Sequence, residues 1–183
     1  MSADLAAKKE RLLALIRRRS LLLHRDFTLS SGRSTSFFFD MKRTLLDPEG
    51  AVLVADLLFN MICDKDVAAI GGLETGAIPI VALLAARSWP ERPITGFFVR
   101  KETKGHGTDQ RIDGLLEPGC RVILFEDVTT TGGSVMQAAE QVRRLDCRIV
   151  KIIAIVDRLE GAQENFQQAG IPFEALFTWR DFN

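Results

Sequence analysis

Cysteine is scarce in this sequence. Its three cysteines, Cys63, Cys120 and Cys147, are far apart in the chain and show no CxxC spacing. An odd number of widely spaced cysteines fits a reducing compartment, and neither a disulfide framework nor a zinc site. Long apolar runs are missing too, because no stretch approaches the about 18 residues of a membrane span and the N-terminus lacks the apolar segment of an export signal. We therefore expect a cytoplasmic protein that does not associate with membranes.

An excess of charge of one sign is also absent. Lys and Arg total 24, and Asp and Glu total 24, which gives a formal net charge of zero. This balance argues against a dedicated nucleic-acid-binding protein. Neither the Walker A pattern, GxxxxGKS or GxxxxGKT, nor the dinucleotide-binding pattern GxGxxG occurs. We therefore expect no nucleic-acid partner, and any phosphate site has to use a different loop.

The 183 residues, 46% of them hydrophobic, are enough for one globular domain with a proper core. No repeat, low-complexity stretch or linker interrupts the chain, so we predict a single domain, 1–183. Helices are expected at 4–19 and 47–62, and Asp47 and Pro48 suit the cap and first turn of the second.

From residue 67 onward, short apolar runs alternate with amphipathic segments. Strands are expected at 67–70, 94–100, 121–127, 149–156 and 173–179. The run at 121–127 is apolar without alternation, which is typical of a parallel strand buried on both faces. The alternation predicts an α/β fold with a mainly parallel central sheet flanked by helices. In such sheets ligands bind beyond the carboxyl ends of the strands.

One of these strands runs into an unusual polar loop. Residues 122–134, VILFEDVTTTGGS, pass from four apolar residues to two acids and then to hydroxyls and glycines. Backbone N–H groups and hydroxyls at a helix N-terminus form a phosphate cradle. The two acids would repel a bare phosphate but can bind sugar hydroxyls, so the pattern predicts a sugar phosphate. The alternative, an ordinary strand-to-helix turn, needs a single capping hydroxyl and not four.

This stretch resembles the motif that binds phosphoribosyl diphosphate (PRPP) in type I phosphoribosyltransferases. Four further segments resemble, in order and spacing, those of the orotate phosphoribosyltransferases: 27–42, 71–80, 100–114 and 157–158. The likeness covers most of residues 27–158. It implies the type I phosphoribosyltransferase fold, with a small hood from the N-terminal segment and a mobile lid loop at 101–113.

The resemblance also implies an activity. The phosphoribosyl group of PRPP would pass to orotate, giving orotidine 5'-monophosphate and pyrophosphate in pyrimidine (UMP) biosynthesis. Mg²⁺ would be bound mainly through PRPP, with no ligand directly from the protein. The enzyme would be a homodimer whose lid acts in the neighbouring subunit's site.

The site residues that the resemblance implies fall into three overlapping groups. Those expected to be catalytic are Lys101, Lys104, His106 and Asp127. Those expected to bind PRPP are Glu74, Thr75, Gly76, Arg100, Lys101, Lys104, His106, Glu126, Asp127, Thr129, Thr130, Thr131, Gly132, Gly133 and Ser134. Those expected to bind orotate are Phe38, Phe39, Thr130 and Arg158.

The lid assignment has a physical basis. The stretch KETKGHGTDQRIDG is too polar to pack and too long for an ordinary connection, and such loops are usually lids or binding loops. Its cationic groups can stabilise charge that develops on departing pyrophosphate, and a closed lid excludes water. The alternative is a solvated surface loop with incidental charge.

The base pocket depends on aromatic residues and one arginine. Phe37, Phe38 and Phe39 cannot all face one core, because side chains alternate along a strand. Arg158 follows an apolar strand, and its planar guanidinium suits the carboxylate that orotate carries and uracil lacks. The alternative is a salt bridge from Arg158 to Asp157 or Glu160.

The sequence departs from the family at two positions. Ser30 stands where many bacterial members carry a lysine that helps to hold the pyrimidine, and Lys42 or Arg43 is the candidate replacement. Thr75 stands where some members carry a lysine. Two other functions therefore remain open: a type I phosphoribosyltransferase for another base, and a non-catalytic regulatory protein that binds PRPP.

Overall fold

A six-stranded sheet forms the centre of the protein in the computed structural model, which describes residues 3–28, 34–63, 65–102 and 111–183. The strand order is β5-β4-β3-β6-β7-β8. Neighbouring strands pair in parallel, except that β5 runs antiparallel to β4. The strands are β3 (Ala69–Gly71), β4 (Thr95–Val99), β5 (Ile112–Gly114), β6 (Arg121–Thr129), β7 (Arg148–Asp157) and β8 (Phe173–Thr178). The prediction of a mainly parallel α/β sheet is confirmed.

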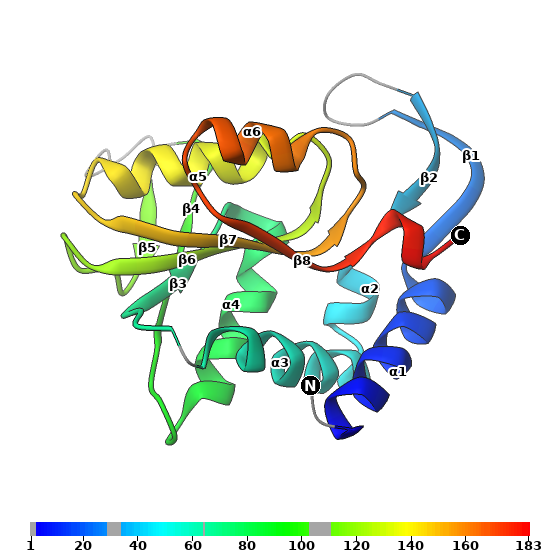
Figure 1. Ribbon diagram of the computed structural model, residues 1–183, viewed down its shortest axis with the longest axis horizontal. Coiled ribbons are helices and arrows are strands. Elements are labelled where there is room, and N and C mark those ends of the chain that lie inside the picture. Colours follow the sequence, from blue (N-terminus) through cyan, green and yellow to red (C-terminus); the bar gives the residue numbers. More distant parts are fainter. Residues whose placement is uncertain (1–2, 29–33, 64, 103–110) are drawn as a thin grey trace.

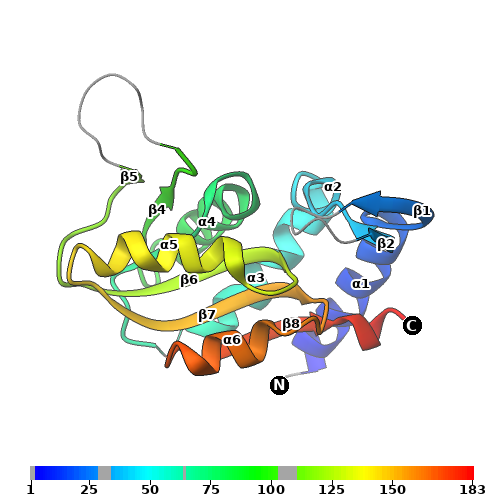
Figure 2. The same ribbon diagram turned by 90° about the horizontal axis from the view of Figure 1, so that it is seen from above.

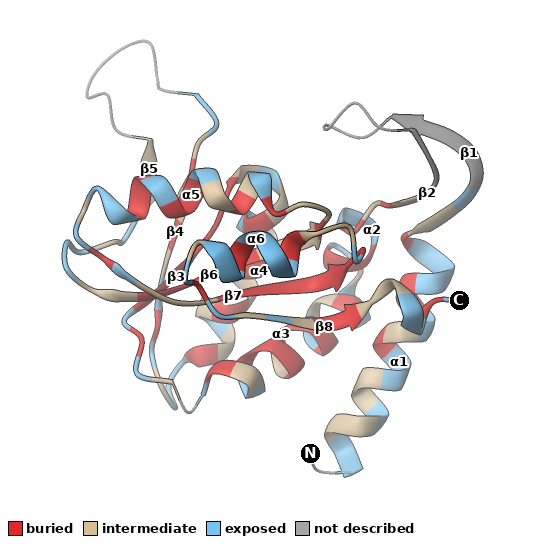
Figure 3. Ribbon diagram, turned by 45° about the horizontal axis from the view of Figure 1, so that its top comes forward, coloured by how far each residue is buried: buried red, intermediate tan, exposed pale blue. Residues whose placement is uncertain are grey.

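Helices cover both faces of this sheet (Figure 1). On one face lie α1 (Ala3–Arg19), α3 (Pro48–Ile62) and α4 (Glu74–Ser88), and on the other lie α5 (Gly133–Arg143) and α6 (Ala162–Gln168). Strand β6 serves both cores: Ile123 and Phe125 pack with the first group, and Val122 and Leu124 with the second. All four side chains are buried, as expected of a parallel strand covered on both sides (Figure 3).

Helix α3 begins where its sequence predicts. Asp47 is its N-cap, and the Asp47 carboxylate accepts the backbone N–H of Glu49 at 3.0 Å and of Gly50 at 3.2 Å. Pro48 occupies the first turn, where no hydrogen bond from its nitrogen is needed. The predicted cap is confirmed.

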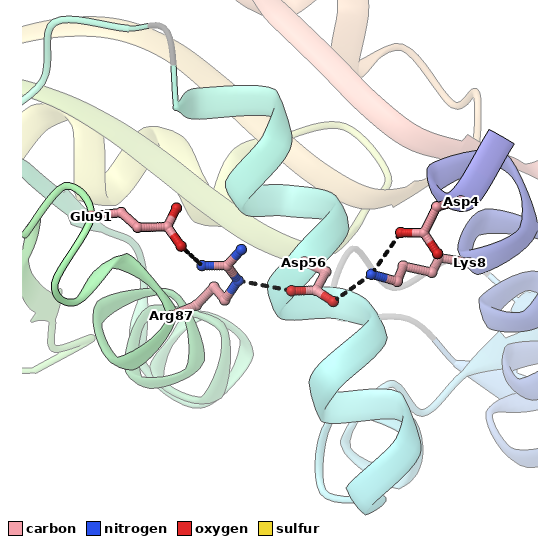
Figure 4. Close-up of polar contacts among 5 residues, drawn as sticks. All are labelled: Asp4, Lys8, Asp56, Arg87 and Glu91. Carbon is pink, nitrogen blue, oxygen red and sulfur yellow. Dashed lines mark hydrogen bonds and ion pairs between the residues drawn. The ribbon is translucent and has the colours of Figure 1, made fainter. Parts of the chain in front are cut away.

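Charged side chains tie the three helices of the first face together (Figure 4). Asp56 of α3 accepts Lys8 Nζ of α1 at 3.0 Å and Arg87 Nε of α4 at 2.8 Å. Lys8 also pairs with Asp4 at 3.0 Å, and Arg87 with Glu91 at 3.5 Å. Burial raises the pKa of Asp56, but the hydrogen bonds from Arg87 and Lys8 outweigh this and leave that pKa below its ordinary value.

A second, two-stranded sheet forms the hood. Strands β1 (Leu21–Thr28) and β2 (Ser34–Phe39) pair antiparallel, and the short helix α2 (Lys42–Leu45) follows them. Figures 1 and 2 place this sheet at the end of the molecule remote from β5. The C-terminal turn η1 (Trp179–Asp181) packs against it, because the ring centroids of Phe37 and Trp179 are 3.7 Å apart. The predicted N-terminal hood is confirmed.

The structure differs from the sequence predictions in several places. Strand β1 and helix α2 were not predicted, β6 extends to Thr129, and residues 112–114 of the predicted lid segment form the edge strand β5. Cys120 and Cys147, distant in sequence, lie together with their sulfur atoms 3.8 Å apart, although both are free. In the described part of the chain, no helix has the length and apolar character that crossing a membrane requires.

Candidate active site

A cleft of about 630 Å³ opens at the carboxyl ends of the central strands, beside the hood. Its wall comes from β2, α2, the segments after β3, β4, β6 and β7, and the first turns of α5. The residues that line it are Phe38, Phe39, Lys42, Leu73, Lys101, Glu102, Glu126, Asp127, Val128, Thr130, Thr131, Gly132, Gly133, Ser134, Gln137 and Arg158. Most of the residues predicted to bind a sugar phosphate and a base are thus brought to one cavity.

Two residues of α6 contact the loop between β6 and α5. Gly132 is left-handed at φ 81°, and a β-carbon there would lie 2.3 Å from the Phe166 ring, so only glycine fits. Asn165 Nδ2 donates to the carbonyl oxygen of Thr131 at 2.8 Å. Helix α5 then begins at Gly133, and its positive end faces the cleft. This arrangement suits a bound phosphate.

Two acids enter the cleft from the end of β6. Burial, and secondly the charge of Asp127, raise the pKa of Glu126 to about 8. Glu126 Oε2 is buried and has no hydrogen-bond partner among the residues that the structure describes. Burial also raises the pKa of Asp127, whose Oδ1 accepts the Val128 N–H at 2.9 Å. A buried oxygen without a partner is costly unless a ligand donates to it, and a sugar hydroxyl is such a donor.

The loop after β3 lies next to these acids. Glu74 has φ 26°, a conformation that is strained for any residue other than glycine, and its Oε1 accepts the Lys101 N–H at 2.7 Å. Gly76 lies so close to Asp127 that a β-carbon would be 2.7 Å from Oδ1. Glu74, Thr75 and Gly76 are not among the cleft-lining residues, although Gly76 lies beside one of them.

Arg158, which follows β7, lines the same cleft. Its side chain is 2% exposed, its Nε donates to Glu160 Oε1 at 2.8 Å, and its guanidinium lies 4.2 Å from the centroid of Phe37. Arg158 therefore forms the salt bridge to Glu160 that was the alternative interpretation, and it also lines the cleft as predicted. Phe38 and Phe39 also line the cavity, and Phe39 packs edge-on against Trp179 as well.

Some predicted residues lie elsewhere. The Arg100 guanidinium forms an ion pair with Asp113 of β5 and is not among the lining residues. Thr129 is buried inside β6, outside the lining. Lys101 is exposed at the edge of the cleft of its own chain. Ser30, Lys104 and His106 fall outside the residues whose side chains the structure describes.

The two candidate replacements for a base-binding lysine differ in position. Lys42 lines the cleft, with its Nζ 3.0 Å from Asp40 Oδ1, whereas Arg43 pairs with Asp40 at 3.5 Å and is not part of the lining. Sequence reasoning did not find Leu73, Glu102, Val128 or Gln137. Gln137 had a usable signal, since it lies one helical turn after Gly133 and thus on the same side of α5.

The site offers few ligands for a metal ion. Within the described residues, no group of three or more His, Cys, Asp or Glu side chains is arranged to hold one. Mg²⁺ takes about six oxygen ligands and often binds through one or two carboxylates together with substrate phosphates and water. The acids of the cleft fit a metal ion that a diphosphate brings with it.

Comparisons with known proteins agree with this geometry. Residues 43–170 match the family described as the phosphoribosyl transferase domain. An orotate phosphoribosyltransferase of Bradyrhizobium diazoefficiens is 46% identical over 182 residues, covering 97% of each chain. One of Aquifex aeolicus is 40% identical over 94% of this chain and 96% of its own.

Solved structures give the same result. A Mycobacterium tuberculosis orotate phosphoribosyltransferase in complex with Fe(III) dicitrate superposes with a TM-score of 0.83 at 33% identity, covering 96% of this chain and 99% of that one. A structure of the same enzyme with PRPP superposes with a TM-score of 0.78 at 27% identity, covering 97% and 92%.

The parallel sheet, the loop at the start of α5 and the family match together define a phosphoribosyltransferase. Relatives at 46% identity over nearly the whole chain narrow the class further. The chain belongs to the orotate phosphoribosyltransferase family of enzymes.

Proposed function

We propose that this protein transfers the phosphoribosyl group of PRPP to N1 of orotate, giving orotidine 5'-monophosphate and pyrophosphate. One observation carries the proposal: a single cleft contains the hydroxyl and glycine residues that lead into α5, two acids at the end of β6 and a buried arginine. The loop suits a phosphate, the acids suit ribose hydroxyls and the arginine suits a carboxylate. Orotate and PRPP together present all three groups.

PRPP binds in the part of the cleft near β6. Its 5-phosphate accepts hydrogen bonds from the backbone and hydroxyls of Thr130–Ser134, and the positive end of α5 stabilises its charge. The ribose hydroxyls donate to Glu126 and Asp127, which gives Glu126 Oε2 a hydrogen-bond partner that none of the described residues supplies. This places C1 of the ribose toward the hood.

Orotate binds between the hood and Arg158. The guanidinium holds the orotate carboxylate, and Phe38 contacts the flat face of the pyrimidine. The main role of these residues is to hold N1 against C1. The N1–C1 bond forms as the C1–O bond breaks, pyrophosphate keeps the bonding electron pair, and N1 releases its proton.

The leaving pyrophosphate lies near Gly76 and Lys101. Mg²⁺, when bound, neutralises the diphosphate charge. The Lys101 ammonium, at the edge of the cleft, stabilises the charge that develops on the leaving group. By resemblance to the family, Lys101, Lys104 and His106 act from the lid of a second subunit in a cytoplasmic homodimer, and Lys101 also lines the cleft of its own chain.

A base panel tests the proposal. Purified protein is incubated with PRPP, Mg²⁺ and one of orotate, uracil, hypoxanthine or nicotinate, and nucleotide formation is followed by chromatography. We expect orotate to be consumed, and only when PRPP and a divalent metal are both present. Faster turnover of uracil or hypoxanthine would assign the enzyme to another base, and PRPP binding without turnover of any base would indicate a regulatory protein.

A further inference from the structure

Three flat groups from distant parts of the chain are layered beside the cleft. The Arg158 guanidinium, which follows β7, lies 4.2 Å from the centroid of the Phe37 ring of β2. The Trp179 indole is stacked on the same phenyl ring. The ring centroids of Phe37 and Trp179 are 3.7 Å apart, and the angle between the two ring planes is 6°. The order is therefore guanidinium, phenyl ring and indole.

Each end of the layer is fixed by hydrogen bonds. The backbone N–H of Arg158 donates to the carbonyl oxygen of Thr129 at 3.0 Å. At the other end, Trp179 opens the turn η1, in which the Thr178 N–H and hydroxyl both donate to Asp181 Oδ2, at 2.7 and 3.1 Å. The backbone on both sides of the stack is thus held in place.

The plane of the guanidinium is held as well. Glu160 Oε1 accepts Arg158 Nε at 2.8 Å along one edge of the group, and the central carbon of the guanidinium lies over the Phe37 ring, 4.2 Å from its centroid. A carboxylate binds a guanidinium best in the plane of the fork, through two parallel hydrogen bonds. Rotation of that plane would lose one of them.

We propose that Phe37, supported by Trp179, is a positioning residue that fixes the plane of the Arg158 guanidinium for a planar carboxylate ligand. The inference rests on the proposed function of Arg158. The contribution comes from the aromatic face, which attracts a cation, and not from hydrophobic volume alone. A leucine at Phe37 fills most of the same space but offers no such face, and a phenylalanine at Trp179 keeps a face that can stack on Phe37.

The test compares Phe37→Leu, Trp179→Leu and Trp179→Phe with the parent protein by calorimetric titration of orotate and, separately, of PRPP. Phe37→Leu is also made in an Arg158→Ala background, which closes a double-mutant cycle. We expect Phe37→Leu to weaken orotate binding roughly tenfold, as the loss of a desolvated cation–π contact predicts, and Trp179→Leu to weaken it less, because it removes only the support of the Phe37 ring. PRPP binding should change less than about twofold, and Trp179→Phe should retain most of the orotate affinity.

The cycle separates positioning from packing. If Phe37 acts through Arg158, Phe37→Leu has no further effect on orotate binding once Arg158 is alanine. A loss of the same size in both backgrounds, an equal loss of PRPP affinity, or no loss at all would overturn the inference. Should Phe37→Leu fail to fold, Trp179→Leu takes its place in the cycle. An Arg158→Ala variant that binds orotate normally would instead refute the proposed role of Arg158, and the positioning role with it.

Discussion

Gly76, in the first turn of α4, lies beside Asp127, near the end of β6. A β-carbon at Gly76 would lie 2.7 Å from Asp127 Oδ1 and 3.3 Å from its carboxyl carbon. The same Oδ1 accepts the Val128 N–H at 2.9 Å, so the carboxylate is not free to move aside without losing that bond. The first turn of α4 therefore limits the positions open to an acid at the end of β6.

This contact predicts a selective effect of Gly76→Ala. The new methyl displaces the Asp127 carboxylate, and losing one charge-assisted hydrogen bond to PRPP should weaken its binding about tenfold to a hundredfold. Alanine favours the helix by up to about 1 kcal/mol, but displacing Asp127 costs its hydrogen bond from Val128, so the free energy of unfolding should change by less than about 1 kcal/mol. Calorimetric titration and urea unfolding measure the two quantities. Unchanged PRPP affinity would contradict the steric argument.

The raised pKa of Glu126 predicts a pH dependence of stability. At pH values between the ordinary Glu pKa of 4.5 and about 8, the folded state binds a proton at Glu126 that the unfolded state releases. The contribution of Glu126 to the free energy of unfolding therefore falls as pH rises through this window. Glu126→Gln removes this loss, so its stability relative to the parent should increase with pH, by on the order of 3 kcal/mol above about pH 8.

Urea unfolding at several pH values measures this difference. Glu140→Gln is the control, because the Glu140–Arg144 pair of α5 is 64% exposed on both sides and should be worth little at any pH. If the difference in free energy of unfolding between Glu126→Gln and the parent stays constant between about pH 5 and pH 9, the Glu126 carboxyl is not the titrating group.

The helix network around Asp56 predicts the opposite pH dependence. The pKa of Asp56 is lowered in the folded protein, so its contribution to stability is present above the ordinary Asp value of about 4 and is lost as pH falls through the folded value. Asp56→Asn should lower the free energy of unfolding by about 1 kcal/mol at neutral pH. The difference from the parent should shrink in acid.

Asp66→Asn is the matched control, since Asp66 is 93% exposed in its pair with Arg121. It should change the free energy of unfolding by less than about 0.5 kcal/mol. Equal effects of the two substitutions would mean that the network between α1, α3 and α4 adds nothing beyond a surface pair.

The proposed shared site predicts complementation between inactive variants. One variant carries a defective cradle, Asp127→Asn with Thr131→Ala, and the other a defective lid, Lys104→Ala with His106→Ala. Lys101 stays unchanged, because it lines the cleft of its own chain. After random exchange, about half of the dimers are hybrids, and each hybrid has one intact site, so about a quarter of the parent activity should return. No recovery, with exchange confirmed by mass spectrometry, would mean that each lid serves its own subunit.

Much of the sheet followed from local sequence signals. The apolar run of β6 predicted a strand buried on both faces, and Val122–Phe125 are buried against helices on both sides. Asp47 and Pro48 predicted the start of α3. These features depend on neighbours in the chain. Strand β5 could not be predicted from local sequence signals, because its three residues, Ile112–Gly114, form a strand only by pairing with the edge of β4.

The site was predicted less completely, because its details depend on contacts that are distant in sequence. The polar loop after β6 and the position of Arg158 in the cleft could be read from residue types at strand ends. Nothing near Arg100 in the sequence indicates that its guanidinium pairs with Asp113, and nothing near Phe37 indicates the stack with Trp179. Such pairings are set by the packing of β4, β5, the hood and the C-terminus.

The most direct test of the account is the base preference of Arg158→Ala. The parent should use orotate with a far higher kcat/KM than uracil, because only orotate carries the carboxylate that Arg158 holds. Arg158→Ala should lose about 2–5 kcal/mol of this advantage and leave the low kcat/KM for uracil nearly unchanged. Arg144→Ala, an exposed arginine of α5, should alter neither value. Equal losses for both bases, or a parent enzyme that prefers uracil, would contradict the account.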